Sequence, residues 1–158
     1  MQGEAIIQYF EERPLASPTI HELSLAIKKS YGWTYTHAKR LAVEGMLRMR
    51  RVGGALECTL NARDERAIGA LCWASAQRAH HATDDARAIA AHVPAALAIV
   101  KGPHGIVVLS EHEHGKHVIN GNELRFATAT RETMDALAGA VILHGYERFW
   151  RRWGETHE

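Results

Sequence analysis

Residues 47–60 form the most constraining pattern in the sequence, because two alternating runs are joined there by a pair of glycines. Residues 47–52 alternate apolar and basic side chains, and residues 55–60 alternate again after Gly53 and Gly54. A period of two is typical of a half-buried β-strand, and two such runs joined by Gly-Gly predict a β-hairpin with a two-residue turn. We therefore expect an antiparallel hairpin in this part of the chain.

Helix signals precede the hairpin. The first helix is expected over residues 3–13, because proline disfavours helical geometry in the residue before it and Pro14 follows. The second helix is expected to open near Thr19, and Glu22 follows three residues later, which is the spacing of a capping box. We expect this second helix to end at Gly32.

Two further helices are expected on either side of the hairpin. Residues 34–44 predict a third helix with Thr34 as its N-cap and Gly45 as its stop, since glycine is favoured just past a helix C-terminus. After the hairpin, Asn61 is expected to cap a long helix over residues 62–81. Small side chains recur along this long helix and allow close approach to another helix.

The remaining chain combines strand and helix patterns. A short helix is expected before Pro94. β-rich runs at residues 95–101 and 106–110 flank a turn, and a second hairpin is expected within residues 118–129. From residue 130 onward the pattern is helical, as one helix or as two helices broken near a glycine.

The order of these elements predicts an α+β fold with three parts. Residues 1–62 are expected to form a module of three helices and a hairpin. Residues 63–94 are expected to form the long linker helix and a short helix, and residues 95–158 a small α+β module for sensing or oligomerisation. The long helix is expected to support dimerisation, with an intramolecular core helix as the alternative.

The net charge of +1 predicts no partner, but the charges are unevenly distributed. Residues 28–63 contain eight Lys or Arg residues and two Glu residues, whereas acids are in slight excess from residue 64 onward. A local basic block suits a surface that faces phosphates, because each neutralised phosphate releases condensed counterions. The alternative interpretation is a solvated charged face.

Cysteine content and hydropathy indicate the compartment. No apolar run approaches the ~20 residues that span a bilayer, and the first residues lack the basic patch and apolar stretch of a secretion signal. Two cysteines, Cys58 and Cys72, provide no disulfide framework. We therefore expect a cytoplasmic protein with no membrane partner.

Residues 19–60 contain the motifs of a family resemblance. The motifs are Thr19-Ile20-His21-Glu22-Leu23 on the second helix, Trp33-Thr34-Tyr35-Thr36-His37-Ala38-Lys39-Arg40-Leu41 on the third, Glu44-Gly45-Met46-Leu47 after it, and the basic hairpin. In this order and spacing the chain resembles the winged helix-turn-helix transcription regulators of the MarR-like and archaeal types. The resemblance implies a winged helix at residues 1–62, with the third helix for recognition and the hairpin as the wing.

The candidate DNA contacts lie on the third helix and around it. N-terminal residues of a recognition helix reach base edges in the major groove, and arginine pairs bidentately with guanine. The expected base contacts are Tyr35, Thr36, His37 and Arg40. The expected phosphate contacts, which position the protein without reading sequence, are Lys28, Lys29, Lys39, Arg48, Arg50 and Arg51.

The expected function is a transcription regulator that binds double-stranded DNA as a homodimer, because a two-fold dimer places two recognition helices one DNA turn apart. Phosphate-binding glycine loops and the Gly-x-Ser-x-Gly motif are missing, so no enzymatic activity is expected. Two alternatives stay open. They are a metal-dependent enzyme that uses the winged helix to clamp nucleic acid, and a winged-helix protein-interaction module.

Histidines cluster shortly before the predicted second hairpin of the C-terminal module. His112, His114 and His117 have a loop-like spacing that suits Zn²⁺ or another divalent transition metal, with Glu111 or Glu113 as an oxygen ligand. The alternative is a polar loop whose histidines bind nothing.

The segment 146–153 interleaves aromatic residues with arginines. This composition suits stacking on single-stranded nucleic acid. It also suits an amphipathic helix in which Phe149 and Trp153 are buried and the arginines extend to solvent, and we favour this second interpretation.

Overall fold

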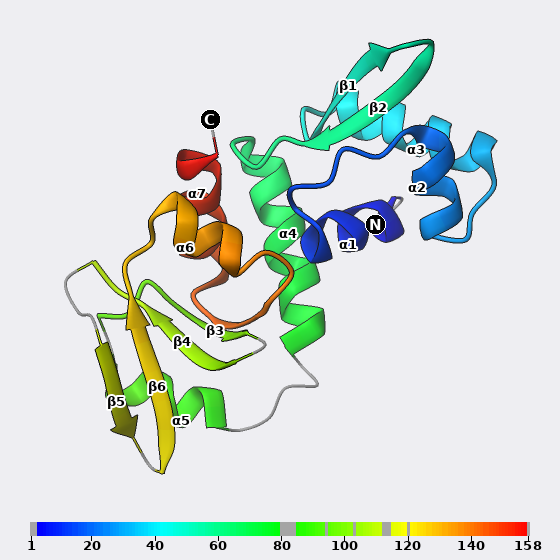
Figure 1. Ribbon diagram of the computed structural model, residues 1–158. Helices are drawn as coiled ribbons and strands as arrows, with labels where there is room; N and C mark the ends of the chain where they lie inside the picture. The colour runs from blue at the N-terminus through cyan, green and yellow to red at the C-terminus, as the bar shows by residue number, and fades with distance from the viewer. Residues whose placement is uncertain are drawn as a thin grey trace. The chain divides into compact units, whose positions relative to one another are not determined.

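The computed structural model describes residues 3–79, 85–93, 95–102, 104–111, 115–119 and 121–157. The chain divides into two compact units, Met1–Ala74 (unit 1) and Ser75–Glu158 (unit 2). Each unit combines helices with its own β-sheet, as predicted for the α+β class (Figure 1). Among the described residues, no helix is both long and apolar enough to cross a membrane.

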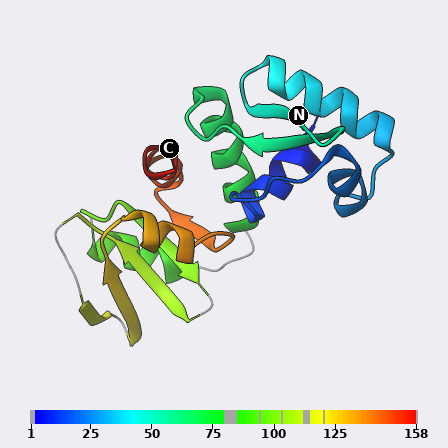
Figure 2. The same ribbon diagram turned by 45° about the horizontal axis from the view of Figure 1, so that its top comes forward.

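Unit 1 combines helices with a two-stranded hairpin. In chain order its elements are α1 (Glu4–Glu12), α2 (Ile20–Ala26), α3 (Tyr31–Val43), β1 (Leu47–Val52), β2 (Ala55–Leu60) and the first turns of α4 (Glu65–Ala79). The hairpin packs against the helices, because α3 contacts β1 and α2 contacts β2 (Figure 2). The residues that fill the core include Ile6, Ile7, Phe10, Leu23, Leu41 and Cys58, each at most 1% exposed. Burial also raises the pKa of the Cys58 thiol to about 11, so that it stays protonated near neutral pH.

The N-terminus of α2 has the predicted capping box. Thr19 Oγ1 accepts a hydrogen bond from the backbone N–H of Glu22 at 3.2 Å, and the Glu22 carboxylate accepts one from the Thr19 backbone N–H at 2.8 Å. These Thr19 donors lower the pKa of the Glu22 carboxyl, because hydrogen bonds favour its charged form.

The boundary between α2 and α3 differs from the predicted one. α2 ends at Ala26, and Gly32 lies in the first turn of α3 instead of ending α2. Ser30, and not Thr34, is the N-cap of α3, since Ser30 Oγ accepts from the Trp33 backbone N–H at 3.2 Å. Thr34 is fully buried and its hydroxyl donates to the Ser30 carbonyl, which is a helix-interior role. The helix is therefore 13 residues long.

The hairpin forms as predicted, with Gly53 and Gly54 as its turn. Both glycines have positive φ, 55° and 86°, as a type I′ turn requires. The segment before α2 pairs with the other edge of β2, because the Cys58 backbone N–H donates to the Pro18 carbonyl at 2.9 Å and Thr19 forms a bridge with Glu57. β2 thus has partners on both edges.

Asn61 does not cap α4, contrary to the prediction. Its side-chain amide donates to the Gly45 carbonyl at 2.7 Å, and its Oδ1 accepts from Arg48 at 3.0 Å. Asp64 caps α4 instead, since its Oδ1 accepts backbone N–H groups of the first turn at 2.9 and 3.3 Å. Asn61 therefore connects the end of the hairpin to the end of α3.

Unit 2 is built on a mixed five-stranded sheet of order β5-β6-β4-β3-β7. After the last turns of α4, its elements are α5 (Asp85–His92), β3 (Ala98–Gly102), β4 (Gly105–Leu109), β5 (Gly115–Ile119), β6 (Asn122–Ala127), α6 (Arg131–Ala136), β7 (Val141–His144) and α7 (Tyr146–Thr156). β4 and β6 pair in parallel, and the other neighbouring strands pair antiparallel.

Strand β7 replaces part of the helix that the sequence pattern predicts after residue 130. Its Ile142 pairs with Val100 at the edge of β3. A short apolar run fits a strand or a buried helix turn equally well, so its pattern alone does not distinguish them. Pairing with β3, some 40 residues earlier in the chain, decides between the two.

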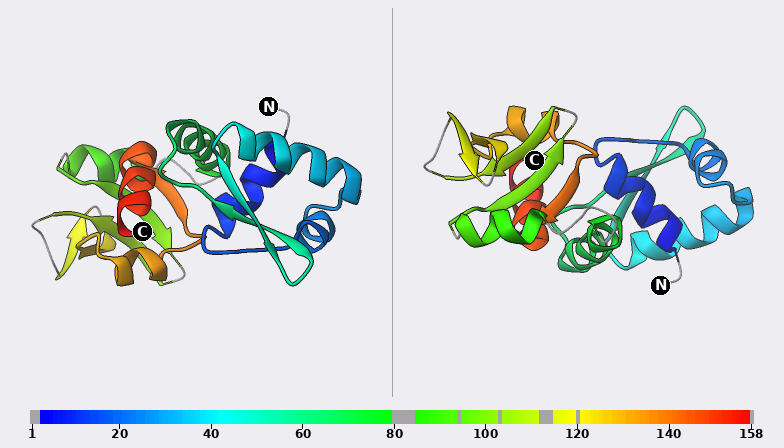
Figure 3. Two further views of the ribbon diagram at one scale, coloured as in Figure 1. Left: turned by 90° about the horizontal axis from the view of Figure 1, so that it is seen from above. Right: turned by 90° about the horizontal axis from the view of Figure 1, so that it is seen from below.

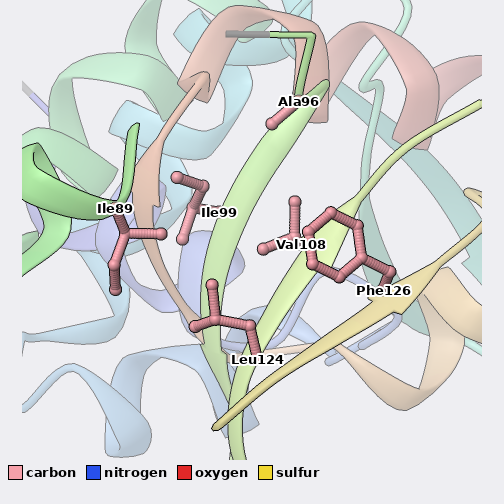
Figure 4. Packing of buried hydrophobic residues seen from close by; sticks show 6 residues of the cluster. All are labelled: Ile89, Ala96, Ile99, Val108, Leu124 and Phe126. Carbon is pink, nitrogen blue, oxygen red and sulfur yellow. The ribbon is translucent and has the colours of Figure 1, made fainter. Parts of the chain in front are cut away.

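One face of the sheet packs against α5. The cluster on this face consists of Ile89, Ala96, Ile99, Val108, Leu124 and Phe126 (Figure 4). Ile99, Val108 and Phe126 come from three neighbouring strands, so they form one continuous apolar layer under the helix.

The opposite face is covered by α6 and α7. α7 contacts β3 and β7, and Figure 3 shows α7 in front of the sheet from above and α5 in front of it from below. Phe149, Trp150 and Trp153 of α7 are at most 3% exposed, and Trp150 Nε1 donates to Ser75 Oγ at 3.0 Å. The predicted burial of Phe149 and Trp153 is confirmed, so these rings are not stacking platforms for a nucleic acid.

Candidate nucleic-acid interface

α3 presents one polar, cationic side to solvent. Its buried side consists of Thr34, Ala38 and Leu41, which the 3.6-residue helical period places together. The exposed residues on the opposite side are Thr36, Lys39, Arg40 and Val43, which we call the α3 ridge.

Aromatic rings flank the α3 ridge on both sides. On one side Tyr31 and Tyr35 stack with centroids 6.5 Å apart, and the Lys39 Nζ lies 6.0 Å from the Tyr35 ring centroid. On the other side the His37 ring stacks on Trp33 at 4.0 Å. Tyr35 and His37, both predicted to contact bases, therefore lie on opposite flanks of the ridge.

The hydrogen bonds within α3 determine what Thr36 and His37 can offer a partner. Thr36 Oγ1 donates to the Gly32 carbonyl at 2.9 Å, and His37 Nδ1 lies 2.8 Å from the Trp33 carbonyl. Because a carbonyl can only accept, Nδ1 holds the proton, and Nε2 of the neutral ring is an acceptor. Both side chains can thus accept from the exocyclic amino groups of adenine or cytosine.

Arg40 provides the guanidinium of the α3 ridge. Its Nε donates to Glu44 Oε1 at 2.9 Å, and the two side chains are 57% and 31% exposed. Exposed pairs of this kind contribute about 0–1 kcal/mol to stability. Arg40 can therefore leave Glu44 and bind a guanine edge or a phosphate at a small cost in free energy.

A pocket of about 770 Å³ adjoins the α3 ridge on the Trp33 flank. The first turn of α1 forms one wall, and Trp33, His37 and Arg40 form part of the other. Thr36 and Lys29 also line it. Of the four predicted base contacts, Thr36, His37 and Arg40 thus line one concave surface, and Tyr35 does not line it.

Two lysines directly precede α3. Lys28 is exposed, has a positive φ of 55°, and its side chain has no partner among the described residues. Lys29 Nζ lies 5.6 Å from the Trp33 ring centroid, a cation–π distance. Their position at the N-terminus of α3, where free backbone N–H groups also attract anions, suits phosphate contacts.

The hairpin arginines lie on two faces. The period of two places Arg48 and Arg50 together, and Arg51 on the face of buried Leu47. Arg50 pairs with Glu57 at 3.4 Å, whereas Arg51 has no partner within the described part of the chain. The three predicted phosphate contacts of the hairpin therefore do not share one face.

The predicted histidine metal site lies mostly outside the described residues, which leave out His112 and His114. His117 is exposed, and its ring packs edge-on against Phe126 with centroids 4.7 Å apart. Among the residues that the structure describes, no three His, Cys, Asp or Glu side chains gather to hold a metal ion. The site stays a prediction.

Three residues beside the candidate contacts are missed by the sequence reasoning. Tyr31 and Trp33 precede the predicted helix start, and Val43 is apolar yet 82% exposed. Ser30 is the signal that could have found the two aromatic residues, because a helix capped there brings both of them into α3.

Comparison of the chain with protein-family models, with curated proteins and with solved structures gave no match.

Proposed function

We propose that unit 1 is a winged helix-turn-helix domain that binds duplex DNA, and that the protein is a transcription regulator. The order of three helices followed by a hairpin supports this proposal. The pairing of Pro18 and Thr19 with β2 also supports it, because it joins the segment before α2 to the sheet of the wing. In this arrangement α3 is the recognition helix.

The α3 ridge is the observation that carries the proposal. A helix of about 10 Å diameter fits the major groove when its outward side offers hydrogen-bonding groups to base edges. Thr36, Lys39 and Arg40 are exposed on that side of α3. The lysines at the start of α3 match the phosphates that border the groove.

The proposed roles follow from the chemistry of each side chain. Arg40 pairs bidentately with a guanine, and Thr36 and His37 accept from exocyclic amino groups. Lys28, Lys29 and Lys39 neutralise phosphates, as does Arg51 at the wing, and these contacts set the register without reading sequence. Binding at an operator then blocks or recruits the polymerase.

We further propose that the protein binds DNA as a homodimer. The apolar residues of α4 do not supply the contact between subunits, because Ala67, Leu71 and Ala74 are at most 1% exposed within one chain, as expected for the alternative of an intramolecular core helix. Two-fold symmetry would place two α3 helices about 34 Å apart, one turn of DNA. The preferred DNA site is therefore expected to be palindromic.

Selection of bound sequences from a random duplex pool tests the proposal. A palindrome should be enriched, and log affinity should fall linearly with log salt. The double variant Lys28→Gln/Lys29→Gln should lower the salt slope by about 2 and leave the enriched sequence unchanged.

Arg13→Gln is the matched control, because Arg13 is an exposed arginine at the end of α1 that pairs with Glu12. It should change neither the slope nor the sequence. Absence of enrichment, or binding that does not depend on salt, would reject DNA binding.

A protein-interaction module is the second candidate, favoured by exposed apolar side chains of unit 1. Val43 is 82% exposed, Leu25 66% and Leu15 54%. An association that survives Lys28→Gln/Lys29→Gln and high salt, but is lost in Val43→Ser, would support this candidate over DNA binding.

A further inference from the structure

Unit 2 contains a partly enclosed pocket of about 560 Å³ on the sheet face that α6 covers. Strands β4, β5 and β6 form its floor, the turn between β3 and β4 forms one rim, and the end of α6 forms another. The pocket is lined by residues of this unit alone, so its chemistry can be considered independently of unit 1 and of DNA.

One side of the pocket is apolar. Val107 of β4 lines it, and Ala136 and Leu137 face it from the end of α6. Gly102 leaves additional room, since a Cβ there would lie 3.6 Å from a Leu137 methyl group. This side suits a small hydrocarbon or aromatic group.

The other side of the pocket is cationic. Lys116 of β5 and Arg125 of β6 are directly opposite each other in the sheet register, so both side chains lie on the same face. Like charges in this position repel. The acid that lines the pocket is Glu123, two residues before Arg125 on β6 and therefore on the same face.

Glu123 compensates only one of these two cations. Its carboxylate lies 2.6 Å from Lys116 Nζ, and this ion pair lowers the pKa of the Glu123 carboxyl. Arg125 has no partner among the described residues. His104, on the rim, adds another hydrogen-bonding ring.

An uncompensated arginine beside an apolar wall is the chemistry that recognises an amphipathic anion. The planar guanidinium holds an oxyanion by two parallel hydrogen bonds, which a point charge cannot do. The register places Val107 next to Arg125 on the adjacent parallel strand, so the apolar body and the anionic head of one molecule would be held side by side.

We propose that this pocket binds a small amphipathic acid, with its oxyanion on Arg125 and its apolar body against Val107 and Leu137. The site is separate from the DNA-binding surface of unit 1, and binding of the acid requires no nucleic acid. Such a site would give the chain a second, small-molecule ligand.

Titration of the full chain with matched probes tests the site. Hexanoate and phenyl phosphate supply a carboxylate and a phosphate on an apolar body, and hexanamide is the neutral control for hexanoate. Isothermal titration calorimetry and amide chemical shifts of β4 and β6 should show saturable binding of an acid with a dissociation constant of about 1 mM or tighter. Hexanamide should bind at least tenfold more weakly, and the better of the two acids identifies the head group.

Two variants separate the anionic and apolar parts of the site. Arg125→Gln should weaken acid binding about tenfold or more, while Arg131→Gln, an exposed arginine at the start of α6 outside the pocket, leaves it unchanged. Val107→Phe should fill the apolar side and weaken hexanoate more than acetate. Equal affinity of wild type and Arg125→Gln, equal affinity for acid and amide, or no saturable binding of either acid would overturn the proposal.

Discussion

α3 in unit 1 and α7 in unit 2 have similar compositions and opposite environments. Each combines bulky aromatic residues with cationic side chains. They are Tyr31, Trp33, Tyr35, Lys39 and Arg40 in α3, and Tyr146, Phe149, Trp150, Trp153, Arg148, Arg151 and Arg152 in α7. Phe149, Trp150 and Trp153 of α7 are at most 3% exposed, whereas Tyr31 and Tyr35 of α3 are 53% and 38% exposed. Residue types alone therefore do not distinguish a core helix from an interaction helix.

The arginines of the two helices differ in the same way. In α7, Arg148 donates to the Ala96 carbonyl at 3.0 Å, and the other two arginines pair with acids of their own helix. The Arg148 bond ties α7 to the segment before β3, whereas the two ion pairs lie within α7. Lys28 and Lys29, which precede α3, and Lys39 within it have no acidic partner among the described residues, so their charges remain available to a polyanion.

Trp150→Ala is expected to have the largest effect, because it removes a fully buried ring and its hydrogen bond to Ser75. We expect a loss of about 3–5 kcal/mol in unfolding free energy, against about 1 kcal/mol or less for Trp33→Ala on α3. Chemical denaturation followed by circular dichroism measures both, and hydrogen exchange of β3 amides assigns the loss to unit 2. Trp150→Phe should recover most of the stability. Equal losses of unfolding free energy in Trp150→Ala and Trp33→Ala would contradict the contrast between a buried α7 and an exposed α3.

Gly145→Ala tests how α7 begins. Gly145 has a φ of 76°, and a Cβ there would overlap the Leu97 carbonyl oxygen of the chain that enters β3. Left-handed strain and this overlap together should cost about 2 kcal/mol or more. Gly32→Ala in the first turn of α3, where a Cβ meets nothing, is the control and should be neutral or stabilising in the same unfolding measurement. A tolerated Gly145→Ala would mean that α7 can shift away from β3.

Arg40→Ala tests the exposed helix by binding. It should cost about 1–3 kcal/mol at the preferred DNA site and relax the preference at one base pair, without changing unfolding free energy by more than about 0.5 kcal/mol. Arg151→Ala on α7 is the matched control and should leave affinity unchanged. Fluorescence anisotropy with the selected duplex and with single-base variants measures both. An equal loss for every duplex would make Arg40 a phosphate contact instead.

Local signals made part of the fold predictable. The Gly-Gly turn between alternating runs and the Thr19–Glu22 spacing each specify an element within a few residues, and both predictions are confirmed. β7 and the role of Asn61 depend on distant partners, β3 and the Gly45 carbonyl, so the sequence near them is ambiguous. An asparagine suits a helix cap and a loop crosslink equally well.

The candidate site was predictable as a set of residue types but not as a surface. Polar and basic residues on the third helix indicate Thr36, Lys39 and Arg40, and all three are exposed. The start of that helix is misplaced because Gly32 is taken as a stop, although glycine is tolerated in a first turn. Which hairpin arginine has an acid opposite it depends on register, and the pattern of the single strand does not contain that information.

Ser30→Ala should have a smaller effect than the changes above. Loss of the bond from the Trp33 N–H to Ser30 Oγ frees one donor at the start of α3 and should cost about 1 kcal/mol of unfolding free energy. Ser30 directly follows Lys28 and Lys29, which are proposed to contact phosphates. Loosening the start of α3 should therefore also lower the affinity for DNA. Ser30→Asp is the control that restores a capping acceptor and should recover stability in thermal unfolding. A fully stable Ser30→Ala would indicate that packing alone holds the start of α3.

The same contrast between paired and unpaired cations exists in the hairpin, where Arg50 pairs with Glu57 and Arg51 does not pair with an acid among the described residues. Substitutions of these two arginines should have the smallest effect on DNA affinity. Arg51→Gln should weaken all duplexes alike and lower the salt slope by about 1, because Arg51 lacks an acidic partner among the described residues. Arg50→Gln should also act on all sequences alike but less strongly, since Glu57 already neutralises part of the Arg50 charge. Affinity measured at several salt concentrations separates the two variants. A larger effect from Arg50→Gln, or a loss confined to one sequence, would show that register and pairing do not decide which arginine of the hairpin meets a phosphate.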